Sequence, residues 1–185
     1  MENKDLNFGE QGKSEKDIIW EEKQREVDKI VDGLGEEIDK NIKDVVVAFV
    51  ANGFSTSASC EGHIVSESEK QRGELYPWID ICLPEPEGWQ ESEDKKEQWR
   101  AENLLQRQRL KNLLKEFYKD KQVTDDANLI FEDIGIFGRF RIRSLGGENM
   151  QSLNSERQKQ LQKIYRKEMN DFAKFLKQKF MLDSN

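Results

Sequence analysis

A thiol and an imidazole lie three positions apart in the segment Cys60-Glu61-Gly62-His63, which holds the only histidine and one of the two cysteines of this 185-residue chain. Both groups are zinc ligands, and an imidazole beside a cysteine also lowers the pKa of the thiol. The spacing therefore predicts one of two chemistries. Either the two side chains hold a metal ion, or Cys60 is a nucleophile with His63 as its general base.

Each chemistry requires further groups from other parts of the chain. A zinc centre needs a third ligand, for which Cys82 and Asp80 are the candidates, and a catalytic centre keeps a fourth position open for water. A cysteine nucleophile needs a group that orients the imidazole ring, and here Asp80, Glu61 and Ser59 are the candidates. A third alternative assigns the segment no chemistry: the thiol is a small buried group at the end of a strand, and the imidazole hydrogen-bonds a loop.

A second group of reactive side chains lies in the segment Arg139-Phe140-Arg141-Ile142-Arg143. In a strand this alternation places Arg139, Arg141 and Arg143 on one face and the two apolar residues on the other. Guanidinium groups bind carboxylate or phosphate through two parallel hydrogen bonds, so the arginine face could hold an anionic small molecule or a nucleotide. Alternatively, the arginines pair across strands with Asp80, Glu132 or Asp133.

The same alternation predicts where these two groups meet. In the strand at residues 77–83, Ile79, Ile81 and Leu83 should face the core and the intervening residues the opposite side of the sheet. We therefore expect a pocket on that side, with the turn at residues 60–63, including Gly62, at its rim and Ser59 beside it. The side chains expected to line it are Trp78, Asp80, Cys82, Arg139, Arg141 and Arg143.

Hydrophobic spacing predicts helices at residues 14–34, 36–51, about 90–121 and 154–180, with breaks at Gly33 and Gly35. Strands are expected at residues 54–60, 77–83, 128–133 and 136–143, and a charged loop at residues 66–75. This order predicts an α+β fold: a four-stranded, mainly antiparallel sheet covered on one face by helices, with a helical N-terminal extension. Residues 1–13 should form a flexible terminus, and residues 14–185 a single domain with long charged helices.

Composition limits the classes of function. The net charge of −7 argues against bulk coating of nucleic acid, because binding phosphate backbones needs concentrated positive charge. The sequence has no apolar run near the roughly 18 residues that span a bilayer and no secretory signal, so we expect a cytoplasmic protein with no membrane partner. With only two cysteines, at most one disulfide could form, and we do not expect a disulfide framework.

The segment from Thr56 to His63 resembles the serine- and cysteine-rich motif of the wybutosine-synthesis tRNA methyltransferase family, in which a strand runs into a Ser-Cys-x-Gly turn followed by a basic residue. Ser59, Cys60 and Gly62 are the matching positions, and His63 stands where that family carries arginine. The resemblance covers about ten residues, and residues 121–150 do not match the family. It implies S-adenosylmethionine as cofactor and an RNA substrate.

We therefore expect a small domain that binds an anionic small molecule or nucleotide at the Cys60–His63 turn and the arginine face. One alternative is a transferase or metal-dependent enzyme that uses the same site, with zinc or S-adenosylmethionine as cofactor. Another is a protein-interaction module whose long helices bind a protein partner, in which case the turn has only a structural role.

Overall fold

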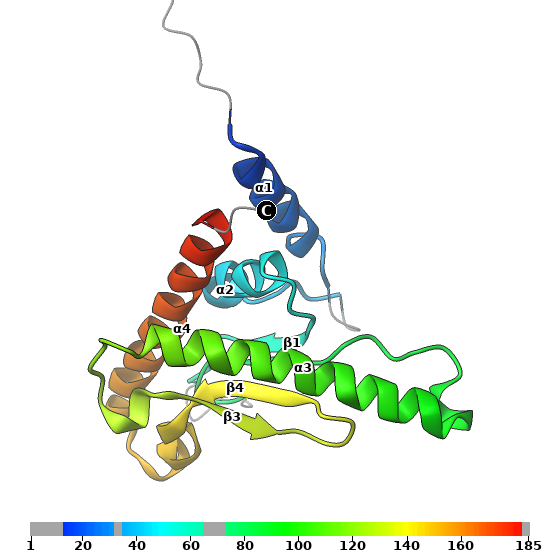
Figure 1. Cartoon of the computed structure of the whole chain (residues 1–185). Coiled ribbons are helices and arrows are strands. Elements are labelled where there is room, and N and C mark those ends of the chain that lie inside the picture. The colour runs from blue at the N-terminus through cyan, green and yellow to red at the C-terminus, as the bar shows by residue number, and fades with distance from the viewer. Residues whose placement is uncertain (1–12, 32–34, 65–72, 183–185) are drawn as a thin grey trace, which may run out of the picture.

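The computed structural model describes residues 13–31, 35–64 and 73–182 (Figure 1). Three sequence predictions fall wholly or mostly outside this part of the chain: the flexible terminus at residues 1–13, the break at Gly33 and the charged loop at residues 66–75. That residues 14–185 form a single domain stays a prediction.

Four antiparallel strands form an open sheet in the order β1-β2-β4-β3. Their bounds are Thr56–Cys60 for β1, Trp78–Ile81 for β2, Leu129–Asp133 for β3 and Phe140–Ser144 for β4. The register places Asp80 of β2 and Glu132 of β3 on either side of Arg141 in β4. The predicted α+β fold with a four-stranded antiparallel sheet is therefore confirmed.

Helices cover one face of this sheet, as predicted. The α-helices span Glu15–Val27 (α1), Lys40–Ala51 (α2), Glu93–Phe117 (α3) and Ser155–Leu182 (α4). Figure 1 shows α3 running along the sheet while α2 and α4 pack together. Alternate strand residues enter the core between these layers, because side chains of a strand point to opposite faces in turn. The most buried members of this core include Phe49, Ile79, Ile81, Leu110, Phe140, Ile142 and Phe172.

The N-terminal half of α4 packs into a second apolar cluster. Tyr165 and Leu161 of this helix meet Leu75 and Tyr76, which precede β2, and Met150 of the short 3-10 helix Leu145–Ser152. Its C-terminal half belongs to the main core. Helix α4 thus connects the segment before β2 with the helical layer.

The first two helices differ from their predicted bounds. A capping box opens α1 at the predicted position, because Ser14 and Asp17 exchange hydrogen bonds. However, α1 ends at Val27 instead of residue 34, and α2 begins at Lys40 instead of residue 36. An isolated antiparallel bridge pairs Val31 with Glu37 between the two helices. Because α2 begins at Lys40, Asp39 immediately precedes the helix.

The strand predicted at residues 136–143 begins later, at Phe140. The backbone φ angles of Gly135, Phe137 and Gly138 are 69°, 61° and 73°. These values lie in the left-handed region, which a strand cannot contain. The hairpin between β3 and β4 therefore has a longer turn than predicted, and Arg139 lies just before the strand.

Candidate metal centre

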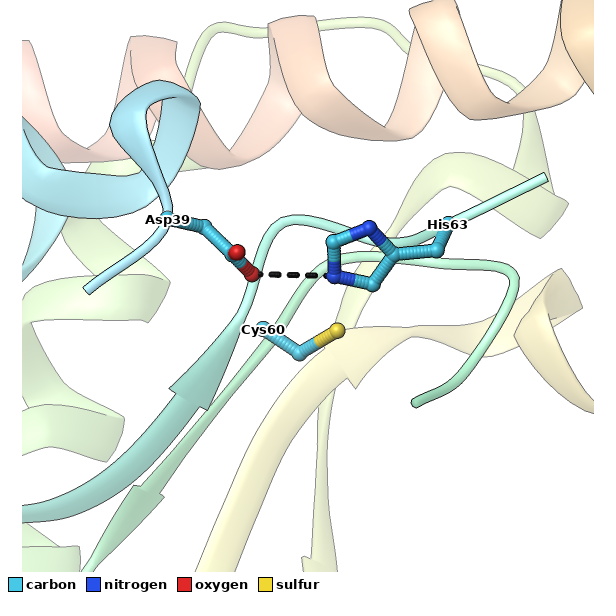
Figure 2. Close-up of side chains that lie close together, drawn as sticks. All are labelled: Asp39, Cys60 and His63. Atoms are coloured by element: carbon cyan, nitrogen blue, oxygen red, sulfur yellow. Dashed lines mark hydrogen bonds and ion pairs between the residues drawn. The ribbon is translucent and has the colours of Figure 1, made fainter. Parts of the chain in front are cut away.

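Three side chains from separate positions converge beside the sheet (Figure 2). Asp39 precedes α2, Cys60 ends β1, and His63 follows the turn after that strand. One potential ligand atom from each lies within 4.8 Å of the other two. Nε2 of His63 lies 3.1 Å from Oδ2 of Asp39. A carboxylate, a thiol and an imidazole thus share one small volume.

The orientation of the imidazole distinguishes between the two predicted chemistries. Figure 2 shows the Asp39 carboxylate and the Cys60 sulfur on the side of the ring that carries Nε2, whereas Nδ1 points the other way. In a nucleophile-base-acid triad, one ring nitrogen faces the nucleophile and the other faces the carboxylate. Here both partners approach the same ring nitrogen. This arrangement is typical of ligands around a common metal ion.

Burial affects the Cys60 thiol most strongly. The residue is 5% exposed, and burial raises the pKa of this thiol. The backbone N–H of Gly62 donates a hydrogen bond to its sulfur at 3.3 Å. A raised pKa disfavours the thiolate that a nucleophile needs, whereas a bound cation would stabilise that thiolate. The side chains of His63 and Asp39 are each about one-third exposed, at 33% and 31%.

The turn after β1 depends on Gly62. Its φ of 83° favours glycine, and a Cβ at this position would lie 2.8 Å from the carbonyl carbon of Tyr76. A side chain there would collide with backbone that cannot give way. The next residue, His63, donates its backbone N–H to the carbonyl of Glu74 at 2.7 Å. The turn is therefore held against the segment that leads into β2, which fixes the position of the His63 backbone.

Two acidic residues meet at the start of α2. Asp39 occupies the N-cap position but makes no side-chain hydrogen bond to the helix; its carboxylate accepts the backbone N–H of Glu61 at 3.1 Å. The Glu61 carboxylate accepts the backbone N–H of Asn41 at 2.8 Å and a hydrogen bond from Arg166 of α4 at 3.0 Å. Glu61 is thus committed to the helix end and does not orient His63.

A cavity of roughly 460 Å³ adjoins the three convergent side chains. It lies between β1 and the connection from α1 to α2, and Trp78 closes part of it. Gly73 packs at its base, where a Cβ would lie 3.0 Å from the Cys60 sulfur. Its described lining residues include the carboxylates of Glu36, Glu37 and Asp39 and no lysine or arginine. The hydroxyl-bearing lining residues are Thr56, Ser57 and Ser59.

The structure separates Cys82 from the cluster, which corrects its selection as the third ligand. Cys60 is opposite Trp78 in the sheet, and the backbone N–H of Cys82 bonds the carbonyl of Ser55 at the other end of β1. Four residues of strand correspond to about 13 Å. The Cys82 sulfur instead lies 3.9 Å from the side-chain nitrogen of Asn103. Among the described residues, Asp39 is the third potential ligand.

Asp80 also has a different partner from the one that a catalytic role requires. Its carboxylate accepts two hydrogen bonds from Arg141, at 2.6 and 3.1 Å. The same guanidinium lies over the ring of Trp78, 3.7 Å from its centroid. Asp80 and Trp78 share the face opposite the helices, as the alternation predicts, but Asp80 orients an arginine and not His63.

The other two arginines have unlike surroundings. Arg143 is 1% exposed and donates to Glu132 at 2.8 Å and to Glu148. Arg139 lies at the Cys82 end of the sheet, because the register pairs Phe140 with Ile81. Its buried Nε has no hydrogen-bond partner in the part of the chain that the structure describes. An anion bound by Arg141 or Arg143 would have to displace carboxylates that these arginines already contact.

The predicted pocket therefore divides into two ends of the sheet. Trp78 and Arg143 lie at the end near Cys60, whereas Cys82 and Arg139 lie at the opposite end. Sequence reasoning did not identify Asp39. Its only local signal is an aspartate just before a helix, and this pattern ordinarily indicates an N-cap.

No helix within the described ranges combines the length and apolarity needed to cross a membrane. Comparison of the chain with models of protein families, with curated proteins and with solved structures gave no match. The resemblance to the wybutosine-synthesis methyltransferases consequently rests on Ser59, Cys60 and Gly62 alone. The cofactor and substrate that it implies stay predictions.

Proposed function

We propose that this protein binds a zinc-type divalent ion through Asp39, Cys60 and His63, and that water or a small polar or anionic molecule takes the remaining coordination position. One observation carries the proposal: three potential ligand atoms from separate segments lie within 4.8 Å of one another and face a common point. In this proposal the ion, and not the arginine face, attracts an anionic ligand.

The donor set favours zinc over a hard cation. Magnesium and calcium prefer oxygen ligands, whereas thiolate and imidazole suit zinc and other borderline or soft ions. Tetrahedral zinc with these ligands would separate neighbouring donor atoms by about 3.4–3.6 Å. The separation of 3.1 Å between His63 and Asp39 is close to this range, and 4.8 Å bounds the others. Small side-chain rotations would therefore complete the geometry.

Three protein ligands are characteristic of catalytic zinc sites, since structural sites use four. The partial exposure of His63 and Asp39 and the adjoining cavity would leave room for a fourth, exchangeable ligand. Zinc activates bound water and polarises carbonyl or phosphoryl oxygens. These properties support a metal-dependent enzyme, with hydrolysis of a small polar substrate as the reaction class, over a transferase that uses the same turn.

The first test is metal content and affinity. We expect the purified protein to bind one zinc ion per chain, as measured by elemental analysis and by competition with a chromophoric chelator. Single substitutions Asp39→Ala, Cys60→Ser and His63→Ala should each weaken zinc binding by about 100-fold or more, because each removes a direct ligand. Zinc at 100 times its dissociation constant should raise the free energy of unfolding of the parent by about 2.7 kcal/mol.

Cys82→Ser is the matched control, since it alters the other buried cysteine without touching the cluster. This variant should keep the zinc affinity of the parent. The proposal fails if the folded parent binds no zinc, or if Cys82→Ser weakens binding as much as Cys60→Ser does. A thermal-shift screen of the zinc-loaded protein with phosphate, carboxylates and nucleotides would then identify the class of the fourth ligand.

A further inference from the structure

We infer that Glu61 is a positioning residue for this centre: it caps helix α2 in place of Asp39 and thereby leaves the Asp39 carboxylate available to the metal. The inference rests on the proposed function. It assigns a role to the residue between Cys60 and Gly62 that neither ligates the ion nor faces the imidazole.

At the N-terminus of α2, Glu61 takes the capping role that Asp39 would normally have. An aspartate at the N-cap normally accepts the backbone N–H of the second or third helical residue. Asp39 makes no such bond, although it occupies that position. The N–H of Asn41, the second residue of α2, instead donates to the Glu61 carboxylate at 2.8 Å. Glu61 therefore satisfies, from a distant part of the chain, the donor that Asp39 would otherwise satisfy.

The exchange is reciprocal. Oδ2 of Asp39 accepts the backbone N–H of Glu61 at 3.1 Å. The same oxygen lies 3.1 Å from Nε2 of His63. The hydrogen bond from Glu61 thus orients the oxygen that would bind the ion. Hydrogen bonds of this kind to a ligating carboxylate fix its direction and tune metal affinity.

Arg166 of α4 holds Glu61 in this position. Its guanidinium donates to the Glu61 carboxylate at 3.0 Å and to the backbone carbonyls of Glu61 and Gly62 at 2.8 and 2.6 Å. The Glu61 side chain is only 15% exposed. One arginine therefore fixes both the carboxylate that caps α2 and the turn that carries His63.

The decisive variant is Glu61→Ala. Without the substitute cap, the unpaired N–H of Asn41 should attract the Asp39 carboxylate away from the imidazole. Loss of such a supporting interaction typically weakens metal binding by about 10- to 100-fold, and we expect a loss in this range by chelator competition. Glu61→Gln should rescue most of the affinity, to within about threefold of the parent, because its amide oxygen can still accept the helix N–H.

Ser92→Ala is the matched control, because it removes the side chain that caps α3 and lies outside the centre. It should lower stability in the same way and leave zinc affinity unchanged. A second measurement separates positioning from general destabilisation: in an Asp39→Ala background, Glu61→Ala should cause no further loss of affinity, since no ligating carboxylate remains to be oriented.

The outcomes are distinguishable. If the parent binds no zinc, the proposed function is wrong. If the parent binds zinc and folded Glu61→Ala binds it equally well, only the positioning role is wrong. An equal additional loss in the Asp39→Ala background would also refute that role, because it would show that Glu61 acts independently of Asp39.

Discussion

The sheet face and the cluster of Asp39, Cys60 and His63 both bring together charged or reactive side chains. The two regions differ in how those side chains are paired. On the sheet face, Asp80 is paired with Arg141, and Arg143 is paired with Glu132 and Glu148. Each charge there has a partner of opposite sign within the chain. In the cluster of Asp39, Cys60 and His63, the potential ligands converge on one another beside a cavity.

This difference separates a structural network from a candidate site. The positive charge of a buried guanidinium that contacts two carboxylates is already compensated, so an added anionic ligand would stabilise it little. A carboxylate, a thiol and an imidazole whose ligand atoms lie within 4.8 Å of one another can all donate electron pairs to a cation, and a cation would stabilise the charged forms of two of them. The way in which reactive side chains are arranged and paired is therefore a better indicator of a site than their presence alone.

The largest expected effect concerns the sheet face. Arg141→Leu should lower the free energy of unfolding by about 3–5 kcal/mol, because it leaves the Asp80 carboxylate, which is 6% exposed, without its partner. Urea denaturation of the metal-free protein would measure this loss. The zinc affinity of the folded variant should equal that of the parent.

The double variant Asp80→Leu/Arg141→Leu is the control for that prediction. Removing both charges should recover part of the lost stability, since no uncompensated charge then remains. A large loss of zinc affinity in folded Arg141→Leu would contradict the separation of the two regions.

An intermediate effect is expected at the base of the cavity. Gly73→Ala and Gly135→Ala each place a side chain at positive φ, 78° and 69°, and should each cost about 1–2 kcal/mol of stability. Only the first adds a Cβ 3.0 Å from the Cys60 sulfur; the second meets nothing within 4 Å. Zinc affinity should therefore fall about tenfold in Gly73→Ala alone. Equal affinities in the two variants would show that the sulfur position is not critical.

The smallest effect is a pH dependence. The hydrogen bond from Arg143 lowers the pKa of Glu132 below its usual 4.5. The ionised carboxylate therefore stabilises the folded state above about pH 4.5, and this contribution is lost as the pH falls through the lowered value. Glu132→Gln should remove that part of the acid sensitivity, by less than about 1 kcal/mol, because the side chain is partly exposed.

Chemical denaturation of the two proteins between about pH 6 and pH 3, with a chelator present to exclude metal effects, would measure this difference. The parent should lose stability more steeply with acid than Glu132→Gln. If the free energy of unfolding falls with pH equally in both proteins, the charge of Arg143 is compensated by Glu148 and not by Glu132.

Much of the fold follows from local patterns in the sequence. The alternation at residues 77–83 and 139–143 predicts which strand residues face the helices, and Ile79, Ile81, Phe140 and Ile142 are each 0% exposed. It does not predict burial of the other face, where Asp80 and Arg143 are buried as well, and Leu83 lies beyond the end of β2 and is half-buried. The connection between α1 and α2 was less predictable. Val31 and Glu37, six positions apart, form an antiparallel bridge. The spacing of apolar residues in the two helices does not predict this bridge.

Two of the three residues of the candidate site could be predicted from the sequence, and the third could not. Cys60 and His63 belong to one turn, so their proximity is visible in the sequence. Alternation predicts the face of a strand on which a residue lies, but not which residue of the neighbouring strand lies opposite. Cys82 was therefore a candidate ligand, whereas the antiparallel register places it at the far end of β1 from Cys60. Asp39 is brought to the turn by tertiary packing, and its position before a helix hides this role behind an ordinary cap.

Strand β1 lies at the edge of the sheet that borders the cavity. Edge strands are templates for the strands of other molecules, and long, flat ones promote aggregation. This strand has five residues, and its register with β2 is broken between Thr56 and Ala58. Such a short, irregular edge is a poor seed for fibre growth. The flank of the sheet that borders the cavity is therefore a poor site for strand pairing between copies of the chain.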